Sequence, residues 1–494
     1  MTASFSFLGL ITLSLVTLMV ESSLVNAKET PTTENSNNNR KLVRFPLLPG
    51  DSAEAKRRRR TRRTQRQLRH HNLRRVEEEA SSKEEEPEEN PLELNIDALY
   101  EGYGVHYVDL WVGQPTPQRV TTIVDTGSSV TGFPCTGCQH CGGRSSWDAY
   151  EAIDQVYTGG NHALADEIRV KEVSFPLHFG CQDSVTGLFE TQLADGIMGL
   201  YNSKPSFWYQ MYQEKKIENK AFSLCFSDPG HVDRQGTPAG AMVLGGSDTR
   251  LHQTPMVYAQ QLAKEGKFTL HLEKVFLLAP GTGESTEIQS DQWNKVQIFE
   301  EDLNNGGNII LDSGTTATYL TKQLLRHFVE VFNSIVPESV MVFDPDQHRY
   351  ELTQNQIDQF LPTIVLQIKG WRPQQGDNDN QQQADIIPGT STQLPGTVGT
   401  DLDPKRAGKS ILVPMPPSSY LSRRDDDIDP QKEPEEVCQY KFSFFFNKRR
   451  GKGGVLGANF MRGLDVLFDI DNSRIGFAAS DCEFSTLASD EESG

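Results

Sequence analysis

The chain has 494 residues, of which 36% are hydrophobic and 9% aromatic, so it can bury a sizeable core in more than one domain. Its formal net charge is -19, but residues 1–75 carry 15 Lys and Arg against 5 Asp and Glu, which leaves the rest of the chain strongly acidic. This acidity excludes nucleic acid as the natural partner of the main body. The 40 glycines and 26 prolines favour many short strands and turns over long helices.

Residues 1–27 have the features of a secretory signal peptide. An apolar stretch over residues 5–20 is followed by a short segment that ends at Ala27, which predicts cleavage after that residue. Because no Lys or Arg precedes the apolar stretch, an uncleaved anchor is the alternative. No later segment is long and apolar enough to span a bilayer. We therefore expect no membrane span after cleavage, and a protein that is secreted or held in the lumen of the endoplasmic reticulum or a vacuole.

Residues 28–94 combine a basic run at 56–75 with an acidic run at 77–89. Such a basic run is typical of a disordered arm or a nucleic-acid patch. Because it follows a signal peptide and precedes an acidic body, we interpret residues 28–94 as a largely disordered pro-segment that folds over an acidic cleft by charge attraction. The arginines at 57–60 and 74–75 are sites for a processing protease specific for basic residues.

An alternation of apolar residues that begins at Tyr103 predicts a hairpin leading into residues 123–129, with the sequence IVDTGSS. Residues 310–316, with the sequence ILDSGTT, repeat its pattern of two large apolar residues, a carboxylate, a hydroxyl and a glycine. Each copy is typical of a buried strand that runs into a tight loop and presents its carboxylate, Asp125 or Asp312. A lone motif of this kind usually means only a turn. Two matched copies 187 residues apart indicate a duplicated half-site.

A pair of carboxylates suits general acid–base work on water. Two carboxylates within hydrogen-bonding reach cannot both ionise, so Asp125 and Asp312 would share a proton. One member can then accept a proton from water while the other donates to a carbonyl. Gly127 and Gly314 allow the two loops to approach closely.

Four hydroxyls complete the two loops. Those of Thr126 and Ser313 can cross-link the loops to each other, and those of Ser128 and Thr315 can bond the outer carboxylate oxygens and hold each carboxylate plane still. Chemistry of this kind needs neither a cofactor nor a metal ion, and we predict neither.

These two loops resemble the signature loops of the pepsin-like aspartic proteases. The family's approach to the first loop is similar to YVDLWVG at residues 107–113, and its apolar-apolar-Gly strand beneath each loop is similar to residues 194–200 and 455–457. The resemblance covers roughly residues 100–482. The cysteine-rich string at residues 133–142 is more similar to the plasmepsin V-like and nepenthesin-like branches, which include processing proteases of the secretory pathway.

The resemblance implies an all-β fold of two related lobes with a cleft between them and few short helices. The expected segments are an N-terminal lobe at 95–254 with the first catalytic loop, a C-terminal lobe at 255–482 with the second loop and with disordered insertions near 373–409 and 422–436, and an acidic tail at 483–494. Helical spacing over residues 322–336, just before Pro337, predicts one short surface helix.

The resemblance also implies an aspartic endopeptidase that hydrolyses peptide bonds with water activated by the two carboxylates. It would be made as a zymogen and act as a monomer, and its partners would be polypeptide substrates, its own pro-segment and a basic-specific processing protease. A catalytically weak or silent binding or inhibitor protein on the same fold is the alternative, because fold does not guarantee function. A nucleic-acid binder would rest on residues 56–75 alone and conflicts with the signal peptide.

A cluster of cysteines follows the first loop. Behind a signal peptide, Cys135, Cys138, Cys141 and Cys181 are expected to form disulfides, although together with His140 they could bind a metal ion instead. The pairing among these four stays open.

Three further cysteines lie elsewhere. Relatives bridge the positions of Cys225 and Cys482, so the resemblance implies that disulfide in this chain. It leaves Cys438 as a thiol, because residues 350–353, where relatives carry its partner, contain no cysteine.

The chain departs from the family in the flap, the hairpin that covers the cleft of relatives and carries a tyrosine. Here Cys141 is followed almost at once by SSWDAY at residues 145–150, which resembles only the outgoing strand of that hairpin. Much of the incoming strand and the expected tyrosine are missing. Either Trp147 or Tyr150 is the substitute cover of a weak protease, or the sequence is a truncated or mispredicted form of an active one.

Overall fold

The computed structural model describes residues 42–46, 95–135, 146–159, 173–182, 192–228, 236–280, 293–296, 300–304, 307–347, 349–371, 399–400, 410–423, 436–449 and 453–483. The predicted signal peptide, the basic and acidic runs, most of both insertions and the tail after residue 483 lie outside these residues. Within the described part of the chain, no helix is long and apolar enough to cross a membrane.

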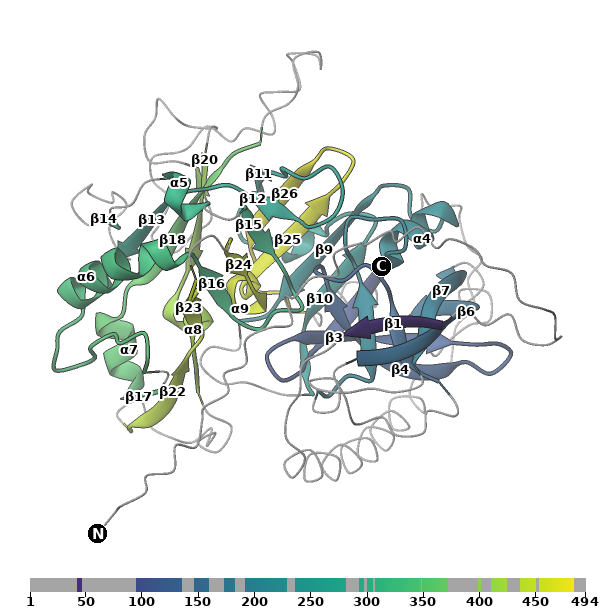
Figure 1. Cartoon of the computed structure of the whole chain (residues 1–494), viewed down its shortest axis with the longest axis horizontal. Helices are drawn as coiled ribbons and strands as arrows, with labels where there is room; N and C mark the ends of the chain where they lie inside the picture. Colours follow the sequence, from purple (N-terminus) through teal and green to yellow (C-terminus); the bar gives the residue numbers. More distant parts are fainter. Residues whose placement is uncertain are drawn as a thin grey trace, which may run out of the picture. The chain divides into compact units, whose positions relative to one another are not determined.

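Strands dominate the structure and the helices are short, as predicted (Figure 1). The described helices are α4 (Phe207–Gln213), η2 (Thr249–Leu251), α5 (Glu300–Leu303), η4 (Lys322–Leu324), α6 (Leu325–Ile335), α7 (Gln354–Phe360), α8 (Pro417–Tyr420) and α9 (Ala458–Met461). Together η4 and α6 confirm the helix predicted over 322–336. Phe328 and Phe332, one turn apart, bury its apolar face, and it ends just before Pro337 because the residue before a proline disfavours helical geometry.

The largest sheet has 13 strands and joins the two ends of the described chain. In spatial order these are β1 (Leu42–Pro46), β6 (Ser146–Thr158), β7 (Phe175–Gln182), β5 (Gly132–Pro134), β8 (Gly196–Gly199), β4 (Gln118–Asp125), β3 (His106–Val112), β2 (Asn95–Glu101), β10 (Pro238–Leu244), β9 (Ala221–Phe226), β25 (Leu464–Asp469), β26 (Arg474–Ala479) and β11 (Val257–Gln260). An extra pairing of β3 with β6 closes the N-terminal strands on themselves. The C-terminal strands β25 and β26 pair with β9 and β11, so the chain's end is anchored in the shared sheet.

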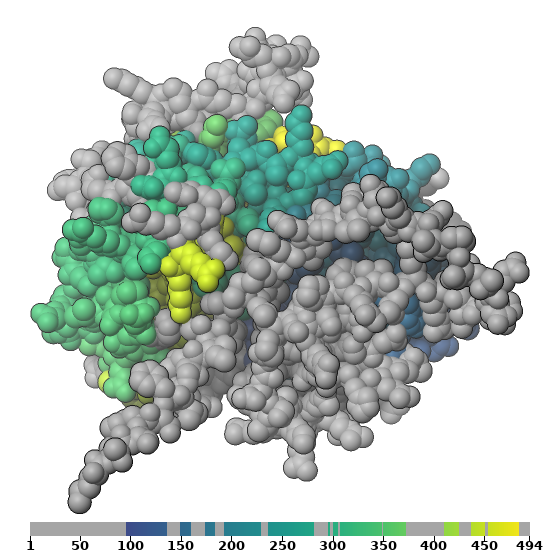
Figure 2. All heavy atoms as spheres, in the orientation of Figure 1, coloured from purple at the N-terminus to yellow at the C-terminus, as the bar shows by residue number. Residues whose placement is uncertain are grey.

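Three smaller sheets come from the second half of the chain. The first contains β12 (Thr269–Leu270), β15 (Ile309–Leu311), β24 (Val455–Leu456), β16 (Thr318–Leu320) and β23 (Phe444–Phe446); the second contains β14 (Trp293–Lys295), β13 (Leu272–Leu278), β18 (Thr363–Lys369), β20 (Ser410–Met415) and β19 (Gly399–Thr400); and the third contains β17 (Arg349–Leu352), β22 (Cys438–Phe442) and β21 (Leu421–Arg423). In the space-filling view, the green atoms of residues 300–370 pack against yellow atoms of the C-terminal part of the chain (Figure 2).

The repeat predicted from the two loops is also present in the strand pairing. Strand β4 runs parallel to β8, which pairs antiparallel with β5. Strand β15 runs parallel to β24, which pairs antiparallel with β16. Strands β8 and β24 are the predicted apolar-apolar-Gly strands, so each half of the chain supports its loop with the same three-strand arrangement.

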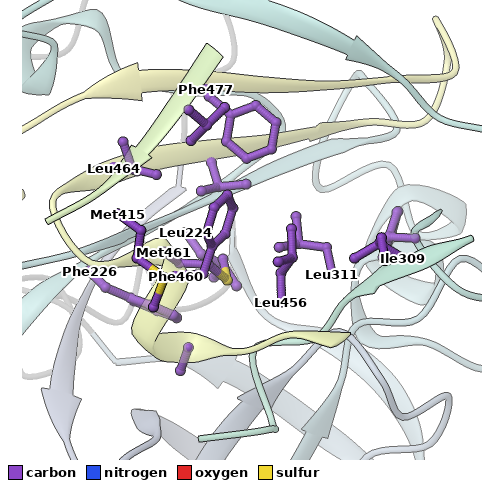
Figure 3. Close-up of a cluster of buried hydrophobic side chains, with 14 of the residues drawn as sticks. Leu224, Phe226, Ile309, Leu311, Met415, Leu456, Phe460, Met461, Leu464 and Phe477 are labelled. Carbon is purple, nitrogen blue, oxygen red and sulfur yellow. The ribbon is translucent and has the colours of Figure 1, made fainter. Parts of the chain in front are cut away.

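A hydrophobic core holds the second of these arrangements in place. Leu311 and Leu456 are both almost fully buried, and they lie beside the residues of β9 and α9 (Figure 3). Phe226, Phe460 and Met461 come from segments more than 200 residues apart and meet in the same cluster. Burial of large apolar side chains contributes about 1.5–3 kcal/mol each, which makes this cluster a rigid base for the loop that follows β15.

Three predicted irregular segments contain short strands. Within the expected pro-segment, residues 42–46 form β1, which pairs antiparallel with β6. The expected insertions contain strand residues as well: β19 lies inside 373–409, and the last two residues of β21, which ends at Arg423, fall within 422–436. In each case a partner strand satisfies the backbone hydrogen bonds, a contribution that composition does not reveal.

Two disulfides are present among the described residues. The bridge between Cys225 and Cys482 confirms the pairing implied by the resemblance, and it lies in a small buried cluster with Ala241 and Leu251. The bridge between Cys135 and Cys181 answers part of the pairing left open and joins the ends of β5 and β7. These two sulfurs are therefore not thiolate ligands, and the other residues of the metal alternative lie outside the described residues.

The third expectation about cysteine concerned Cys438. It is buried at the start of β22, belongs to neither disulfide and keeps its thiol, as predicted. Its Sγ lies 3.7 Å from the carbonyl oxygen of Glu436.

Replacing both Cys225 and Cys482 with Ala should lower the free energy of unfolding by about 3–5 kcal/mol. The bridge spans a sequence separation of 257 residues, and opening so long a loop raises the entropy of the unfolded chain. Denaturant titration without reductant measures the change. Cys438→Ala is the matched control, because it removes a buried thiol without opening a bridge; an equal loss in both variants would contradict the assignment.

Candidate active site

The first loop begins where β4 ends. Val124 is fully buried and Ile123 nearly so, which fixes the strand, and Asp125 is its last residue. The Asp125 carboxylate accepts a hydrogen bond from Gly127 N at 2.7 Å on Oδ1 and one from Ser128 Oγ at 2.5 Å on Oδ2. Both carboxylate oxygens are therefore held by their own loop; the sequence predicted the hydroxyl bond from Ser128 but not the backbone bond from Gly127.

The second loop repeats this geometry after β15. Gly314 N donates to Asp312 Oδ1 at 3.0 Å, and Thr315 Oγ1 donates to Asp312 Oδ2 at 2.8 Å. The backbone of Asp312 is fixed by the neighbouring strand β24, because its N–H donates to the carbonyl of Leu456 at 2.9 Å. Each carboxylate thus has one backbone and one hydroxyl donor, at matching positions in the two copies.

Reciprocal hydrogen bonds join the loops across 187 residues of sequence. Thr126 N donates to Ser313 Oγ and Ser313 N donates to Thr126 Oγ1, both at 3.0 Å. Each hydroxyl also donates across, Thr126 Oγ1 to the carbonyl of Leu311 at 3.2 Å and Ser313 Oγ to that of Val124 at 2.8 Å. Both hydroxyl residues are almost completely buried, so these bonds are shielded from water.

The two glycines are required by the close approach of the carboxylates. A Cβ added to Gly127 would lie 2.7 Å from Asp312 Oδ1, and one added to Gly314 would collide with the carboxyl group of Asp125. No larger residue fits at either position without separating the loops. The glycines predicted to permit this approach therefore do so.

Burial and proximity make the pair hold a proton. Asp125 is 3% exposed and Asp312 is 4% exposed, and their side chains lie within hydrogen-bonding distance of each other. Burial, followed by the charge of Asp312, raises the pKa of Asp125 from its ordinary 3.8 to about 8. At neutral pH the pair consequently carries a proton, which is the state needed for one member to donate while the other accepts.

Asn459 supports the second loop, although the sequence did not predict it as a site residue. Asn459, the second residue of α9, accepts from Thr318 Oγ1 at 2.9 Å, and its own Nδ2 donates to the carbonyl of Ser443 at 2.9 Å. Its backbone N–H donates to the carbonyl of Thr316, next to the second loop. The asparagine lies two residues after the 455–457 string, but nothing in the local sequence signals its partners.

A buried ion pair connects β2 to the segment after α9. Arg462 Nη2 lies 3.0 Å from Glu101 Oε1, and both side chains are less than a tenth exposed. Nearby, the ring of His106 stacks on that of Phe226 with centroids 3.9 Å apart. Burial, with the Arg462 charge as a second cause, lowers the pKa of His106 to about 3, so this imidazole is neutral. No sequence pattern pairs residues 361 positions apart.

The residues proposed as a substitute flap lie on β6. The backbone of Trp147 pairs with that of Phe45 in β1. Tyr150 pairs with Cys181 in β7 and with Leu42 in β1, and its half-buried side chain packs against the main core. Whether either side chain covers the carboxylates stays a prediction.

No group of three or more His, Cys, Asp or Glu side chains suited to a metal ion occurs within the described ranges. Cys138, His140 and Cys141 lie outside them. The carboxylates of the site are satisfied by backbone and hydroxyl donors, an arrangement that suits a bound water rather than a hard cation.

Comparison with known proteins places this geometry in a family. The sequence profile of the eukaryotic aspartyl protease family matches residues 106–480. The chain belongs to this family. Its two lobes are therefore the two related β lobes of the pepsin-like fold, as the sequence led us to expect.

Individual relatives are distant. The chain is 22% identical to gastricsin of Callithrix jacchus over 78% of its own length and 82% of that protein. It is 20% identical to plasmepsin V of Plasmodium falciparum, covering 77% and 71% of the two chains. A shorter stretch of 209 residues is 27% identical to aspartic protease 5 of Toxoplasma gondii, covering 31% of this chain and 20% of that one.

Replacing Asp125 with Asn should change how stability depends on pH. In wild type the folded state keeps its proton up to about pH 8 while the unfolded chain loses it near 3.8, so stability is lost between about pH 4 and pH 8, at up to about 1.4 kcal/mol per pH unit. The Asn side chain does not ionise and lacks this loss.

The measurement is the denaturant midpoint of both proteins at several pH values in that window. Asp346→Asn is the matched control, because Asp346 is an exposed carboxylate far from the loops in sequence. Parallel profiles for wild type and Asp125→Asn would show that Asp125 does not hold a raised pKa.

Proposed function

We propose that this protein is an aspartic endopeptidase in which Asp125 and Asp312 activate water for attack on a peptide bond. The observation that carries the proposal is the joining of two equivalent loops by reciprocal Thr126 and Ser313 hydrogen bonds, which places the side chains of Asp125 and Asp312 within hydrogen-bonding distance. Such an arrangement is costly to bury and has no structural purpose that apolar residues would not serve better. Family membership supports a polypeptide as the substrate.

The mechanism follows from the shared proton. In the singly charged pair, the ionised carboxylate accepts a proton from a bound water molecule, and the resulting nucleophile attacks the scissile carbonyl. The protonated carboxyl donates to the carbonyl oxygen, and the pair then protonates the leaving amine. No covalent intermediate forms. Gly127, Ser128, Gly314 and Thr315 act as positioning residues, since their donors fix the orientation of both carboxylates.

The protonation state of the carboxylate pair determines the pH range in which the enzyme is active. Because the pKa of Asp125 is raised to about 8, the pair keeps its proton at neutral pH and loses it above pH 8. Activity therefore falls as pH rises through that value, because a doubly ionised pair cannot donate to the carbonyl.

The N-terminal segment supports synthesis as a zymogen in the secretory pathway. The apolar stretch at 5–20 and the following basic run predict a signal peptide and a pro-segment that is attracted to the acidic body. A protease specific for basic residues would cut at 57–60 or 74–75, and the processed enzyme would act as a monomer, secreted or lumenal.

A second candidate function is a weak or catalytically silent binding protein. The incomplete flap favours it, because a cover excludes water and orients substrate, and its loss weakens positioning more than it disturbs the carboxylates. Retention of all six loop residues around the two carboxylates favours the enzyme.

Changing either carboxylate to Asn should abolish peptide hydrolysis, lowering kcat by about a thousandfold or more, since one carboxyl group cannot both deprotonate water and protonate the carbonyl. The assay is cleavage of a peptide library by purified protein, with folding checked by circular dichroism. Asp346→Asn is again the control. Near-full activity of a folded Asp312→Asn protein would reject the endopeptidase proposal.

Cutting the full-length protein at both 57–60 and 74–75, which removes most of the basic run, should raise its hydrolysis rate, because the run is then no longer joined to the acidic body. High salt should produce part of the same rise in uncut protein, since the contact is largely screened charge. A cut engineered near Asn38, outside the basic run, is the control. Uncut protein as active at low salt as cut protein would count against inhibition by the segment.

A further inference from the structure

The first residues of β6 depend on β1 for their strand pairing. The ladder between β6 and β7 begins at Ala149, and the one between β6 and β3 covers only the other end of β6. For residues 146–148, β1 is the sole strand partner within the described part of the chain. Without β1, this stretch would be an open sheet edge with unpaired backbone donors and acceptors.

This edge is connected to the first catalytic loop through a short series of strands. Tyr150 of β6 pairs with Leu42 of β1 on one side and with Cys181 of β7 on the other. Cys181 is bridged to Cys135, directly after β5, and β5 lies beside β8, which supports β4. The position of residues 146–150 is thus tied covalently and by ladders to the strand that carries Asp125.

The sequence lacks the incoming strand of the flap, and β1 occupies the neighbouring position along β6. The chain lacks most of the strand that should enter the flap before residue 146, and β1 runs antiparallel along the residues where that strand is missing. The register is continuous over five pairs, from Leu42 with Tyr150 to Pro46 with Ser146. An antiparallel neighbour of this length supplies what a hairpin partner would supply.

We propose that residues 42–46 are a permanent part of the working protein, in which they serve as the incoming strand of the flap along β6. The proposal rests on the endopeptidase function argued above, because the flap has a role only if substrate is bound. It assigns the open edge of β6 to one occupant, a segment of this same chain.

The proposal changes what processing removes. Both predicted cutting sites, at 57–60 and 74–75, lie between β1 and β2, which begins at Asn95. A cut at either site separates β1 from the lobes covalently but leaves its pairing with β6 intact. After cuts at both sites, most of the basic run would be released, and the processed enzyme would consist of two fragments with the flap strand retained.

The first test uses full-length folded protein with a specific cleavage site introduced at residues 51–52. After cutting, the N-terminal fragment should co-elute with the lobes in size-exclusion chromatography, and the amides of residues 146–150 should stay protected in hydrogen exchange. Release of the fragment, with no change in the exchange of those amides, would overturn the proposal.

A variant makes the test specific for the strand. Val43→Pro with Phe45→Pro should release the fragment after cutting and raise the exchange rate of residues 146–150 by about tenfold or more, because proline removes a backbone donor and fixes φ near -65°. Asn38→Pro, outside β1, is the control and should behave as wild type. Equal retention of the fragment in all three proteins would show that something other than β1 holds it.

Catalysis gives a separate measurement. The same double variant should lower kcat/KM by about tenfold, and a synthetic peptide of residues 40–48 should restore it in the cut protein. Restoration by a scrambled peptide would mean that β6 accepts any strand and would overturn the assignment to residues 42–46. Because fragment retention and amide protection do not require catalysis, an inactive protein that retains its fragment would reject the endopeptidase while leaving the strand pairing established.

Discussion

The contact between two buried carboxylates is the constraint on which the rest of the structure depends. Desolvation and mutual repulsion oppose it, which is why the pKa of Asp125 is raised to about 8. The loops tolerate the contact because every neighbouring donor is already in place: one backbone N–H and one hydroxyl on each carboxylate, and the Thr126 and Ser313 bonds between loops. Such preorganisation leaves little to rearrange when a substrate arrives.

Holding two loops from different halves of a chain in contact requires rigid support under each. Each loop emerges from a parallel pair of short strands, β4 with β8 and β15 with β24, whose apolar residues are buried. The long sheet then joins the halves, since the C-terminal strands pair with β9, and the Cys225 to Cys482 bridge and the Glu101 to Arg462 ion pair fasten the same junction.

The start of β6, which we propose as the flap, is held less firmly than the carboxylates. Each carboxylate is held by two hydrogen bonds from its own loop. Residues 146–148 at the start of β6 have one strand partner among the described residues, β1, which lies about 100 residues upstream. Regions with few contacts are the ones that open most readily, which suits a cover that must admit and release substrate. With β1 as that cover's second strand, as proposed, processing leaves in place a segment that catalysis uses.

The sequence alone determined the features that arise from local pattern. The two IVDTGSS-like strings specified both loops, their carboxylates and their hydroxyls, because a short motif dictates hydrogen bonds within three residues of itself. Helical spacing and Pro337 fixed η4 and α6 in the same way. The family resemblance, rather than any residue count, gave the all-β class and the Cys225 to Cys482 bridge.

Only the tertiary structure decided the rest, and in each case the reason is distance along the chain. Glu101 and Arg462 are 361 residues apart, Asn459 finds its partners on two other segments, and β1 finds β6 about 100 residues away. Residues 42–46 cannot be recognised as a strand from their sequence, because the hydrogen bonds that define a strand come from its neighbour. Composition therefore predicted disorder there. Likewise, the bridge between Cys135 and Cys181 depended on β5 lying beside β7, which no cysteine spacing could specify.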